Sequence, residues 1–215
     1  MDTRARKPSG NVLIDGPDDP AGTIVLAHGA GAGMDSPFMT AIAEGLAEGR
    51  MRVIRFEFPY MQERRADGKR RPPDPKRVLD AAWHEVIDGL GREGLIIGGK
   101  SLGGRIASMV ADEARVRGLV CLGYPFHPPG RPEKTRTRHL EVLSTPALIL
   151  QGTRDPFGKP EEVETYRLSK TIRVHWIEDG DHSFKPRAKS GRTLGQNVEE
   201  AVAALLQFVA GLSSR

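Results

Sequence analysis

The residues with the clearest chemical potential lie in a glycine-rich segment near the middle of the chain. Gly99-Lys100-Ser101-Leu102-Gly103 matches the pattern G-x-S-x-G, in which a serine stands on a sharp turn between a strand and a helix. Small residues at Gly99 and Gly103 let the strand and the helix approach their neighbours closely, and a helix N-terminus at Ser101 favours a developing negative charge. The alternative is a phosphate-binding or merely tight turn. With the partners described next, the segment predicts a nucleophilic serine.

A candidate acid and a candidate base follow the serine at two later strand ends. Asp155 comes after the apolar run 147–151 and His182 after the run 172–177, with spacings of 54 and 27 residues along the chain. Taken alone, Asp155 before Pro156 is more typical of a turn aspartate. The order Ser, Asp, His is nevertheless the order of a triad in which histidine takes the serine proton and the carboxylate orients the histidine. The sequence therefore predicts acyl-transfer chemistry.

A second glycine-rich segment, residues 27–33, follows the first apolar strand. Its backbone N–H groups could stabilise an oxyanion together with the N–H of the residue after the nucleophile. We expect Leu102 and Ala30 to supply this pair, with Gly31 a weaker candidate than Ala30. The glycine spacing does not match the G-x-G-x-x-G of a pyrophosphate turn, and His28 at the strand end is expected to be structural.

Short apolar runs alternate with helix-length segments around these residues. We expect strands at 24–27, 52–58, 95–98, 119–122, 147–151 and 172–177, an edge strand at 12–14, and helices at 36–48, 74–91, 103–115, 160–168 and 194–209. This alternation predicts a three-layer α/β sandwich with a mostly parallel sheet of about 6–7 strands and helices on both faces. Functional residues would lie at the carboxyl ends of the strands. The insert between Tyr124 and Ala147 is too short for a multi-helix lid, so we expect a minimal lid or none.

The length and composition are those of an ordinary globular protein. The 215 residues fit a single domain over 1–215, with a flexible segment at 1–10. A single cysteine excludes a disulfide framework and a Cys-rich zinc site. No apolar run approaches the ~18 residues of a membrane span, and the first ten residues do not have the apolar stretch of a signal peptide. We therefore expect a cytoplasmic protein with no metal and no organic cofactor.

The net charge of +4 is distributed unevenly along the chain. Residues 61–77, 131–138 and 185–192 carry +4, +3 and +4, which leaves −7 for the remainder. In a parallel sheet all three segments leave from the edge that carries Ser101. They predict either a positive rim that favours anionic substrates or a set of solvated loop charges. No basic stretch is interleaved with aromatic residues, so we expect neither a nucleic-acid nor a membrane partner.

Five stretches carry a resemblance to a known superfamily over nearly the whole chain: HGAG at 28–31, RFEFPYM at 55–61, GGKSLGGR at 98–105, GYPFHPPG at 123–130 and DHSF at 181–184. The sequence resembles the α/β-hydrolases. More closely, it is similar to the small hydrolase-like family of testis-expressed protein 30 and the hydrolase-like domain of a histone-acetyltransferase complex subunit, and more distantly to dienelactone-hydrolase-like enzymes. The resemblance implies an α/β-hydrolase fold and a triad of Ser101, Asp155 and His182. It implies no particular substrate.

Together these observations predict a serine hydrolase that cleaves a small ester or thioester through an acyl-enzyme, with a small-molecule acyl substrate as its partner. The alternative is a non-catalytic interaction module on the same fold, because some members of the family look like scaffolds. Lys100 precedes the nucleophile. Its side chain is either turned aside from the chemistry or is a cation close enough to favour anionic substrates. The acyl group, the leaving group and the oligomeric state remain open at this stage.

Overall fold

The computed structural model describes residues 12–212, so the flexible segment expected at 1–10 lies outside the described residues. Seven strands form one sheet: β1 (Val12–Asp15), β2 (Gly22–Ala27), β3 (Met51–Phe56), β4 (Ile96–Lys100), β5 (Gly118–Leu122), β6 (Ala147–Gly152) and β7 (Ile172–Ile177). Their spatial order is β1-β3-β2-β4-β5-β6-β7. Only β1 is antiparallel to its neighbour, which confirms the mostly parallel sheet.

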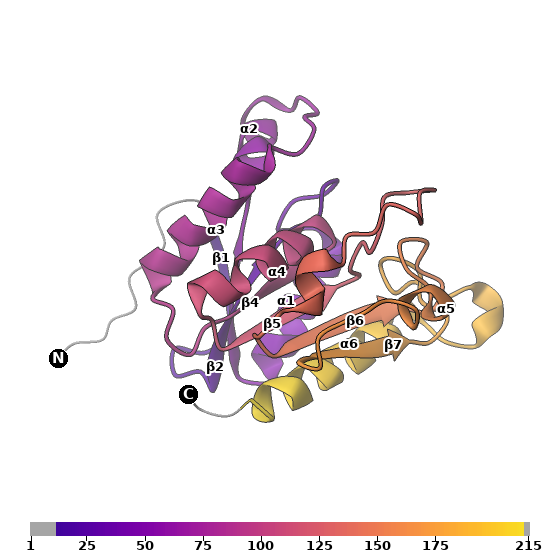
Figure 1. Ribbon diagram of the computed structural model, residues 1–215. Helices are drawn as coiled ribbons and strands as arrows, with labels where there is room; N and C mark the ends of the chain where they lie inside the picture. The colour runs from indigo at the N-terminus through magenta and orange to yellow at the C-terminus, as the bar shows by residue number, and fades with distance from the viewer. Residues whose placement is uncertain (1–11, 213–215) are drawn as a thin grey trace.

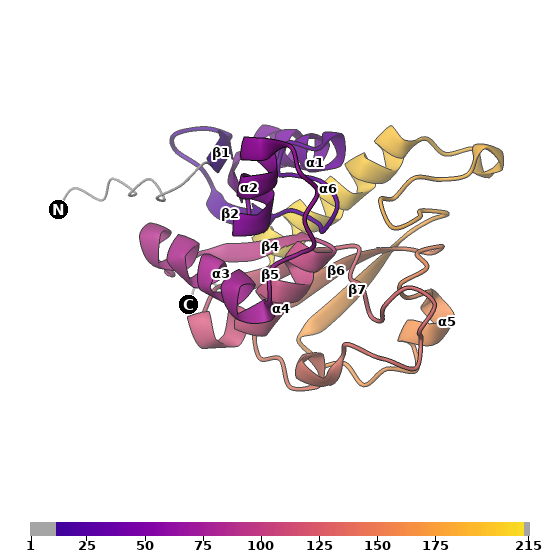
Figure 2. The ribbon, with the colours of Figure 1, turned by 90° about the horizontal axis from the view of Figure 1, so that it is seen from above.

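Helices cover both faces of this sheet (Figure 1 and Figure 2). The main helices are α1 (Pro37–Glu48), α2 (Pro59–Asp67), α3 (Lys76–Leu90), α4 (Leu102–Ala114), α5 (Pro160–Val163) and α6 (Leu194–Ala210), with 3₁₀ turns at Arg138–Glu141 and Ala188–Ser190. Apolar side chains of α1 and α6 pack on one face, and those of α3 and α4 pack on the other. The predicted three-layer sandwich is confirmed.

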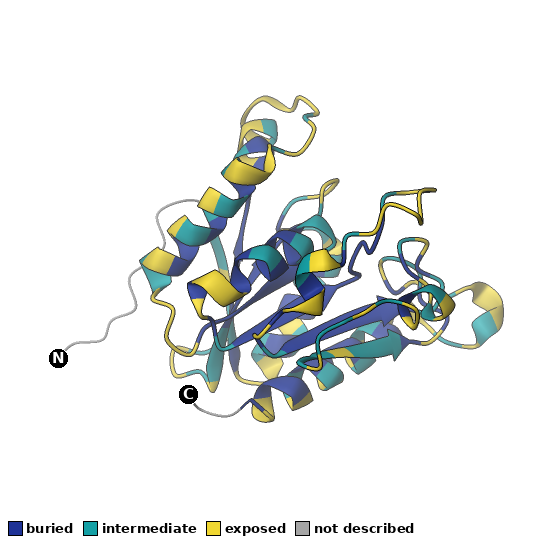
Figure 3. Cartoon of the chain, viewed as in Figure 1, coloured by how far each residue is buried: buried dark blue, intermediate teal, exposed yellow. Residues whose placement is uncertain are grey.

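The central strands are buried because helices cover them on both sides (Figure 3). This explains why they read as continuous apolar runs rather than alternating patterns. Since β2 to β7 are parallel, the chain leaves all six strands at one edge of the sheet. Within residues 12–212, no helix combines the length and the apolar character that crossing a bilayer requires.

One helix was not predicted, and two predicted helices have different bounds. Helix α2 was not expected, because its exposed, charged sequence has little apolar periodicity. The helix predicted at 160–168 ends at Val163, after which the chain turns toward β7. The helix predicted from Asp74 begins at Lys76, because Asp74 instead accepts a hydrogen bond from the N–H of Tyr60 at 2.8 Å. Asp74 therefore satisfies the first turn of α2 rather than that of its own helix.

Candidate active site

The predicted nucleophile lies at the junction of β4 and α4. Ser101 has φ 50° and ψ −110°, a strained conformation for a residue with a side chain. The turn is tight because β2 lies directly beside it. A methyl group added to Gly99 or Gly103 would lie 2.2 Å or 2.3 Å from the carbonyl oxygen of Ala27. The two glycines of G-x-S-x-G are thus required by close backbone contact, as the sequence pattern predicts.

His182 and Asp155 meet beyond the carboxyl ends of β6 and β7. Asp155 follows β6 and is fully buried, and His182 follows β7. The Nδ1 of His182 donates to Oδ2 of Asp155 at 2.7 Å. The same carboxylate accepts the side-chain amide of Gln151 at 3.0 Å, and its other oxygen accepts the N–H of Phe157 at 2.9 Å. Asp155 is therefore both the expected turn aspartate and the partner of the histidine ring.

The two neighbouring aspartates point elsewhere. Asp181 accepts the backbone N–H groups of Ser183 and Lys185 at 2.8 Å and 3.0 Å, which closes the turn around His182. Asp179 accepts the side chain and the N–H of Arg187, and hydrogen bonding to this guanidinium lowers the pKa of the Asp179 carboxyl. The geometry thus pairs His182 with Asp155 and not with Asp179 or Asp181.

Ser101 and His182 line a common cleft of about 400 Å³. Its walls are largely apolar and come from the loop after β2, from the start of α1 and from the turn after β6. We call residues 29–35 the oxyanion loop because they include Ala30, the predicted donor. Phe38 and Phe157 are the large side chains of this lining. The ring of Phe157 also lies 4.5 Å from that of His182, centroid to centroid.

The peptide between Gly29 and Ala30 is held in one orientation. The N–H of Phe58 donates to Nε2 of His28 at 3.1 Å, so the ring carries its proton on Nδ1, which donates to the Gly29 carbonyl at 2.6 Å. Burial lowers the pKa of His28, which keeps this ring neutral. The Tyr60 hydroxyl also reaches the carbonyls of Gly29 and Ala30, at 3.3 Å each.

This arrangement has a consequence for the predicted oxyanion donors. A trans peptide carries its C=O and N–H on opposite sides, so the Ala30 N–H points away from His28 and Tyr60. Among the hydrogen bonds of residues 12–212, neither the Ala30 N–H nor the Leu102 N–H has an acceptor. Ala30 lines the same cleft as Ser101, and Leu102 directly follows Ser101, so the two N–H groups stay the candidate oxyanion donors.

The rest of the oxyanion loop is braced by residues after β3. Buried Glu57 accepts the N–H of Met34 at 3.2 Å and pairs with Arg65 of α2 at 2.6 Å. Arg64 of the same helix donates to the carbonyl of Gly31 at 3.0 Å. Helix α2 therefore holds the loop through side-chain contacts, a role that the sequence analysis missed.

Gln151 is a second residue that the sequence analysis missed. Its amide oxygen accepts the N–H of Tyr124 at 2.7 Å, and its amide nitrogen reaches Asp155 and the carbonyl of Gly158. It is completely buried at the end of β6. A polar residue that closes an otherwise apolar strand is the signal that could have identified it.

Lys100 is turned beneath the loop that carries His182. It is 8% exposed, its Nζ donates to the backbone carbonyl of His182 at 2.6 Å, and it lies 5.5 Å from the centre of the Phe38 ring. Burial lowers the pKa of Lys100 to about 8, against the opposing effects of Asp155 and Asp181. The side chain lines the cleft. Lys100 therefore lies at the site rather than turned aside from it, and its ammonium donates a hydrogen bond to the loop that carries His182.

The three basic segments leave β3, β5 and β7 at the edge of the sheet that carries Ser101. Several of their cations are already paired with carboxylates: Arg65 with Glu57 and Asp35, Arg71 with Asp67, Arg187 with Asp179, and Arg192 with Glu200. Among the described residues that line the cleft, none belongs to these segments.

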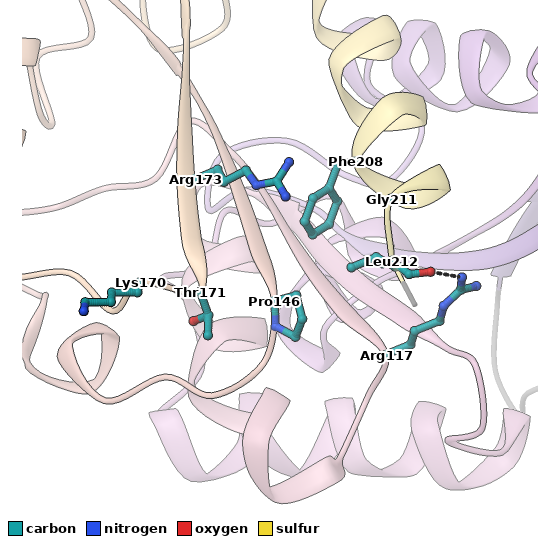
Figure 4. A pocket seen from close by; sticks show the side chains of 8 residues that line it. All are labelled: Arg117, Pro146, Lys170, Thr171, Arg173, Phe208, Gly211 and Leu212. Atoms are coloured by element: carbon teal, nitrogen blue, oxygen red, sulfur yellow. Dashed lines mark hydrogen bonds between the residues drawn. The ribbon is translucent and has the colours of Figure 1, made fainter. Parts of the chain in front are cut away.

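A second cavity of about 340 Å³ lies at the opposite edge of the sheet, beside the end of α6 (Figure 4). Arg117 donates to the Leu212 carbonyl at 2.7 Å on one side, and Arg173 lies beside Phe208 on the other. Lys170 is directed away from them. No residue of the predicted site lines this cavity. Within residues 12–212, no group of three His, Cys, Asp or Glu side chains could hold a metal ion.

Comparison with known proteins places this architecture in a family. Residues 20–210 match the family described as alpha/beta hydrolase domain, and the chain belongs to this family. It is similar to the dienelactone hydrolase from Anabaena variabilis, with 18% identity over 97% of this chain and 95% of that one and a TM-score of 0.71.

Two further solved structures share the fold. Est1E from Butyrivibrio proteoclasticus has 14% identity over 93% of this chain and 94% of that one, with a TM-score of 0.69. A lidless α/β serine hydrolase from Xanthomonas campestris has 20% identity over 93% and 87%, with a TM-score of 0.65. The family match confirms the predicted superfamily, and these structural likenesses confirm the predicted fold. The narrower resemblance to the family of testis-expressed protein 30 stays a prediction.

Proposed function

We propose that this protein is a serine hydrolase that cleaves a small ester or thioester, with Ser101, His182 and Asp155 as its triad. The observation that carries the proposal is that a strained Ser101 lines the same cleft as a histidine whose ring is hydrogen-bonded to a fully buried carboxylate. Strain at a serine and a bonded His–Asp pair are costly features that a merely structural turn does not require.

The reaction follows from these positions. His182 takes the Ser101 proton as the serine oxygen bonds to the acyl carbon, and the same proton then passes to the departing alkoxide or thiolate. Water attacks the acyl-serine, gives its proton to His182, and releases the acid while Ser101 regains a proton. Asp155 keeps Nδ1 protonated and stabilises the imidazolium. The N–H groups of Leu102 and Ala30 hold the oxyanion, and each such donor contributes about 2.7–4 kcal/mol in comparable enzymes.

The cleft favours a compact, apolar acyl group. Its volume of about 400 Å³ and its walls of alanine, proline, methionine and phenylalanine side chains suit a short chain or one aromatic ring. Est1E, which shares the fold, binds ferulic acid. We therefore include aromatic acyl esters among the substrates to be tested. Preference for an anionic substrate would come from the basic segments or from Lys100 and is part of this proposal.

Labelling with a fluorophosphonate probe tests the proposal most directly. We expect one adduct at Ser101 in the wild-type protein and none in Ser101→Ala, with both proteins showing the same circular dichroism. Hydrolysis of acetyl, butyryl, octanoyl and hydroxycinnamoyl esters and of the matching thioesters is then measured with the wild-type enzyme before and after labelling. Inactivation of turnover in proportion to labelling would tie the activity to this serine.

The competing interpretation is a non-catalytic interaction module on the same fold. It would be favoured if the folded protein gave no adduct at Ser101 and hydrolysed no ester or thioester of the panel. An adduct at another residue, with full turnover retained in Ser101→Ala, would contradict the assigned nucleophile.

A further inference from the structure

A single hydrogen bond holds the main chain of His182, among the residues that the structure describes. The His182 carbonyl accepts it from Nζ of Lys100 at 2.6 Å, and within residues 12–212 the His182 N–H has no acceptor. The neighbouring residues of the turn are held independently, since Asp181 accepts two backbone N–H groups and the Phe184 carbonyl accepts the side-chain amide of Asn197 at 2.7 Å. Lys100 is therefore the contact that fixes the main chain of His182 itself.

The lysine also ties this loop to the strand that carries the serine. Lys100 is the last residue of β4 and directly precedes Ser101, whereas His182 follows β7. In the sheet, β5 and β6 lie between these two strands. The hydrogen bond therefore reaches across two intervening strands and connects the main chains of the two residues that exchange a proton in the proposed reaction.

The contact is enclosed at the end of β5. Gly123 directly follows β5 with φ 68°, and a methyl group added there would lie 2.8 Å from the His182 carbonyl oxygen and 3.0 Å from Nζ of Lys100. The same methyl group would lie 3.2 Å from Nδ1 of His182. Gly123 is itself fixed, because its N–H donates to the Leu150 carbonyl at 2.8 Å. The hydrogen bond is thus part of a close-packed arrangement rather than a surface contact.

Packing alone does not explain a lysine at this position. Lys100 is buried, and within residues 12–212 no carboxylate forms an ion pair with its ammonium. A buried ammonium without a carboxylate partner costs stability, and an apolar side chain of similar length would fill the same space without that cost. The benefit of the lysine therefore lies in the contact that its ammonium makes.

We propose that Lys100 is a positioning residue for His182. Its ammonium holds the main chain of the base while Asp155 orients the ring, so that Nε2 stays within hydrogen-bond reach of the Ser101 hydroxyl. The inference rests on the proposed function, because it gives Lys100 a task in the reaction between Ser101 and His182. In this role the ammonium contacts neither the substrate nor the reacting atoms, which separates it from a cation that binds an anionic substrate.

Kinetics of Lys100→Met test this role on the full chain, with a neutral ester that the wild type hydrolyses. Methionine keeps the apolar stem and removes the N–H donors. We expect kcat to fall about tenfold or more and KM to stay within about twofold, because a displaced base weakens the transition state and not substrate binding. Fluorophosphonate labelling of Ser101 should slow in parallel. The melting temperature at pH 7.5 should not decrease, because a buried charge is removed, so the loss of kcat cannot come from unfolding.

Lys159→Met is the matched control, because Lys159 is exposed after β6 and its side chain forms no hydrogen bond within residues 12–212. Its kcat should stay within about twofold of the wild type. Lys100→Ala gives a second readout. Propylammonium matches the deleted part of the side chain and should restore kcat in a saturable way, whereas tetramethylammonium has no N–H group and should not. Absence of rescue, or equal rescue by the two cations, would overturn the proposal.

The outcomes separate this role from the proposed function. Wild-type activity that Lys100→Met retains in full would overturn the positioning role alone. A loss that appears only as a higher KM for anionic esters would also overturn it, because it would place the ammonium against the substrate. Absence of both labelling and turnover in the wild type would overturn the proposed function and the role of Lys100 with it.

Discussion

At the scale of single residues, the contacts of Asp155 identify it as the carboxylate that orients His182 in the proposed triad. Its carboxylate is fully buried and accepts His182, Gln151 and Phe157 at once. We predict that Asp155→Asn lowers kcat by about 10³–10⁴-fold, because an amide in this position stabilises the wrong tautomer of the histidine. Steady-state kinetics of both proteins, on an ester that the wild type hydrolyses, measures this change in kcat.

Asp179→Asn is the comparison for this prediction. Asp179 pairs with Arg187 and Arg154 rather than with the histidine, so its replacement should lower stability and leave kcat of the folded enzyme within a few-fold. A larger loss of kcat in Asp179→Asn than in Asp155→Asn would reverse the assignment of the acid.

Lys100 gives a prediction about pH and stability. Burial lowers its pKa from 10.5 to about 8 in the folded protein, so between these values the unfolded chain binds more protons at this site. Stability rises with pH wherever the unfolded state binds more protons. We therefore expect the unfolding free energy of the wild type, relative to Lys100→Met, to increase by about 3 kcal/mol between pH 7.5 and pH 10.5.

Urea unfolding of both proteins across this pH range provides the measurement. The difference between them isolates Lys100 from the tyrosines that titrate in the same window. A difference that stays constant with pH would show that the ammonium is not desolvated. Lys100→Met should also raise the mobility of the His182 loop, which loses its hydrogen bond to Nζ.

At the level of elements, α2 contributes Tyr60 and Met61 to the core and also orients the loop after β2. Tyr60 reaches two carbonyls of the oxyanion loop at 3.3 Å. Because a single hydrogen bond contributes about 0.5–1.5 kcal/mol net, we predict that Tyr60→Phe lowers kcat about 3–10-fold with little change in KM. Tyr166→Phe serves as the control, since the hydroxyl of Tyr166 makes no hydrogen bond within residues 12–212. Equal kinetics of the two variants would argue against a role of α2 in catalysis.

The junction of β2, β4 and α4 gives a prediction about stability. A methyl group on Gly103 would lie 2.3 Å from the Ala27 carbonyl oxygen, and the other nearest atoms are also rigid backbone, at 2.7 Å. We predict that Gly103→Ala lowers the unfolding free energy by about 2 kcal/mol or more. Gly31→Ala is the matched control, because nothing lies within 4 Å of the added methyl group, and its stability should stay within about 0.5 kcal/mol of wild type. Chemical denaturation of both variants measures the difference.

At the level of the whole molecule, the three basic segments give a prediction about how the enzyme selects between anionic and neutral substrates. If they act as a positive rim, kcat/KM for an anionic ester should fall about tenfold or more between low salt and 0.5 M salt, while a neutral ester with the same leaving group changes little. The carboxylates already paired with Arg65, Arg71 and Arg187 reduce the expected effect. Parallel salt dependences for the two esters would show that the rim does not select charge.

The sequence by itself determined the order of layers and the positions of the triad candidates. The apolar runs before Ser101, Asp155 and His182 are long enough to be buried strands, and parallel strands necessarily deliver their following residues to one edge of a sheet. The tight turn at Ser101 was also predictable from the local sequence, since glycines two positions on either side of a serine make such a turn possible.

Only the tertiary structure decided which side chains meet across that edge. The preference of His182 for Asp155 over its sequence neighbours, the contact of Lys100 with the His182 carbonyl and the bracing of the oxyanion loop by α2 join residues 27–82 positions apart. Local propensity carries no information on such contacts, because they depend on the register and twist of the assembled sheet and on which loops it brings together.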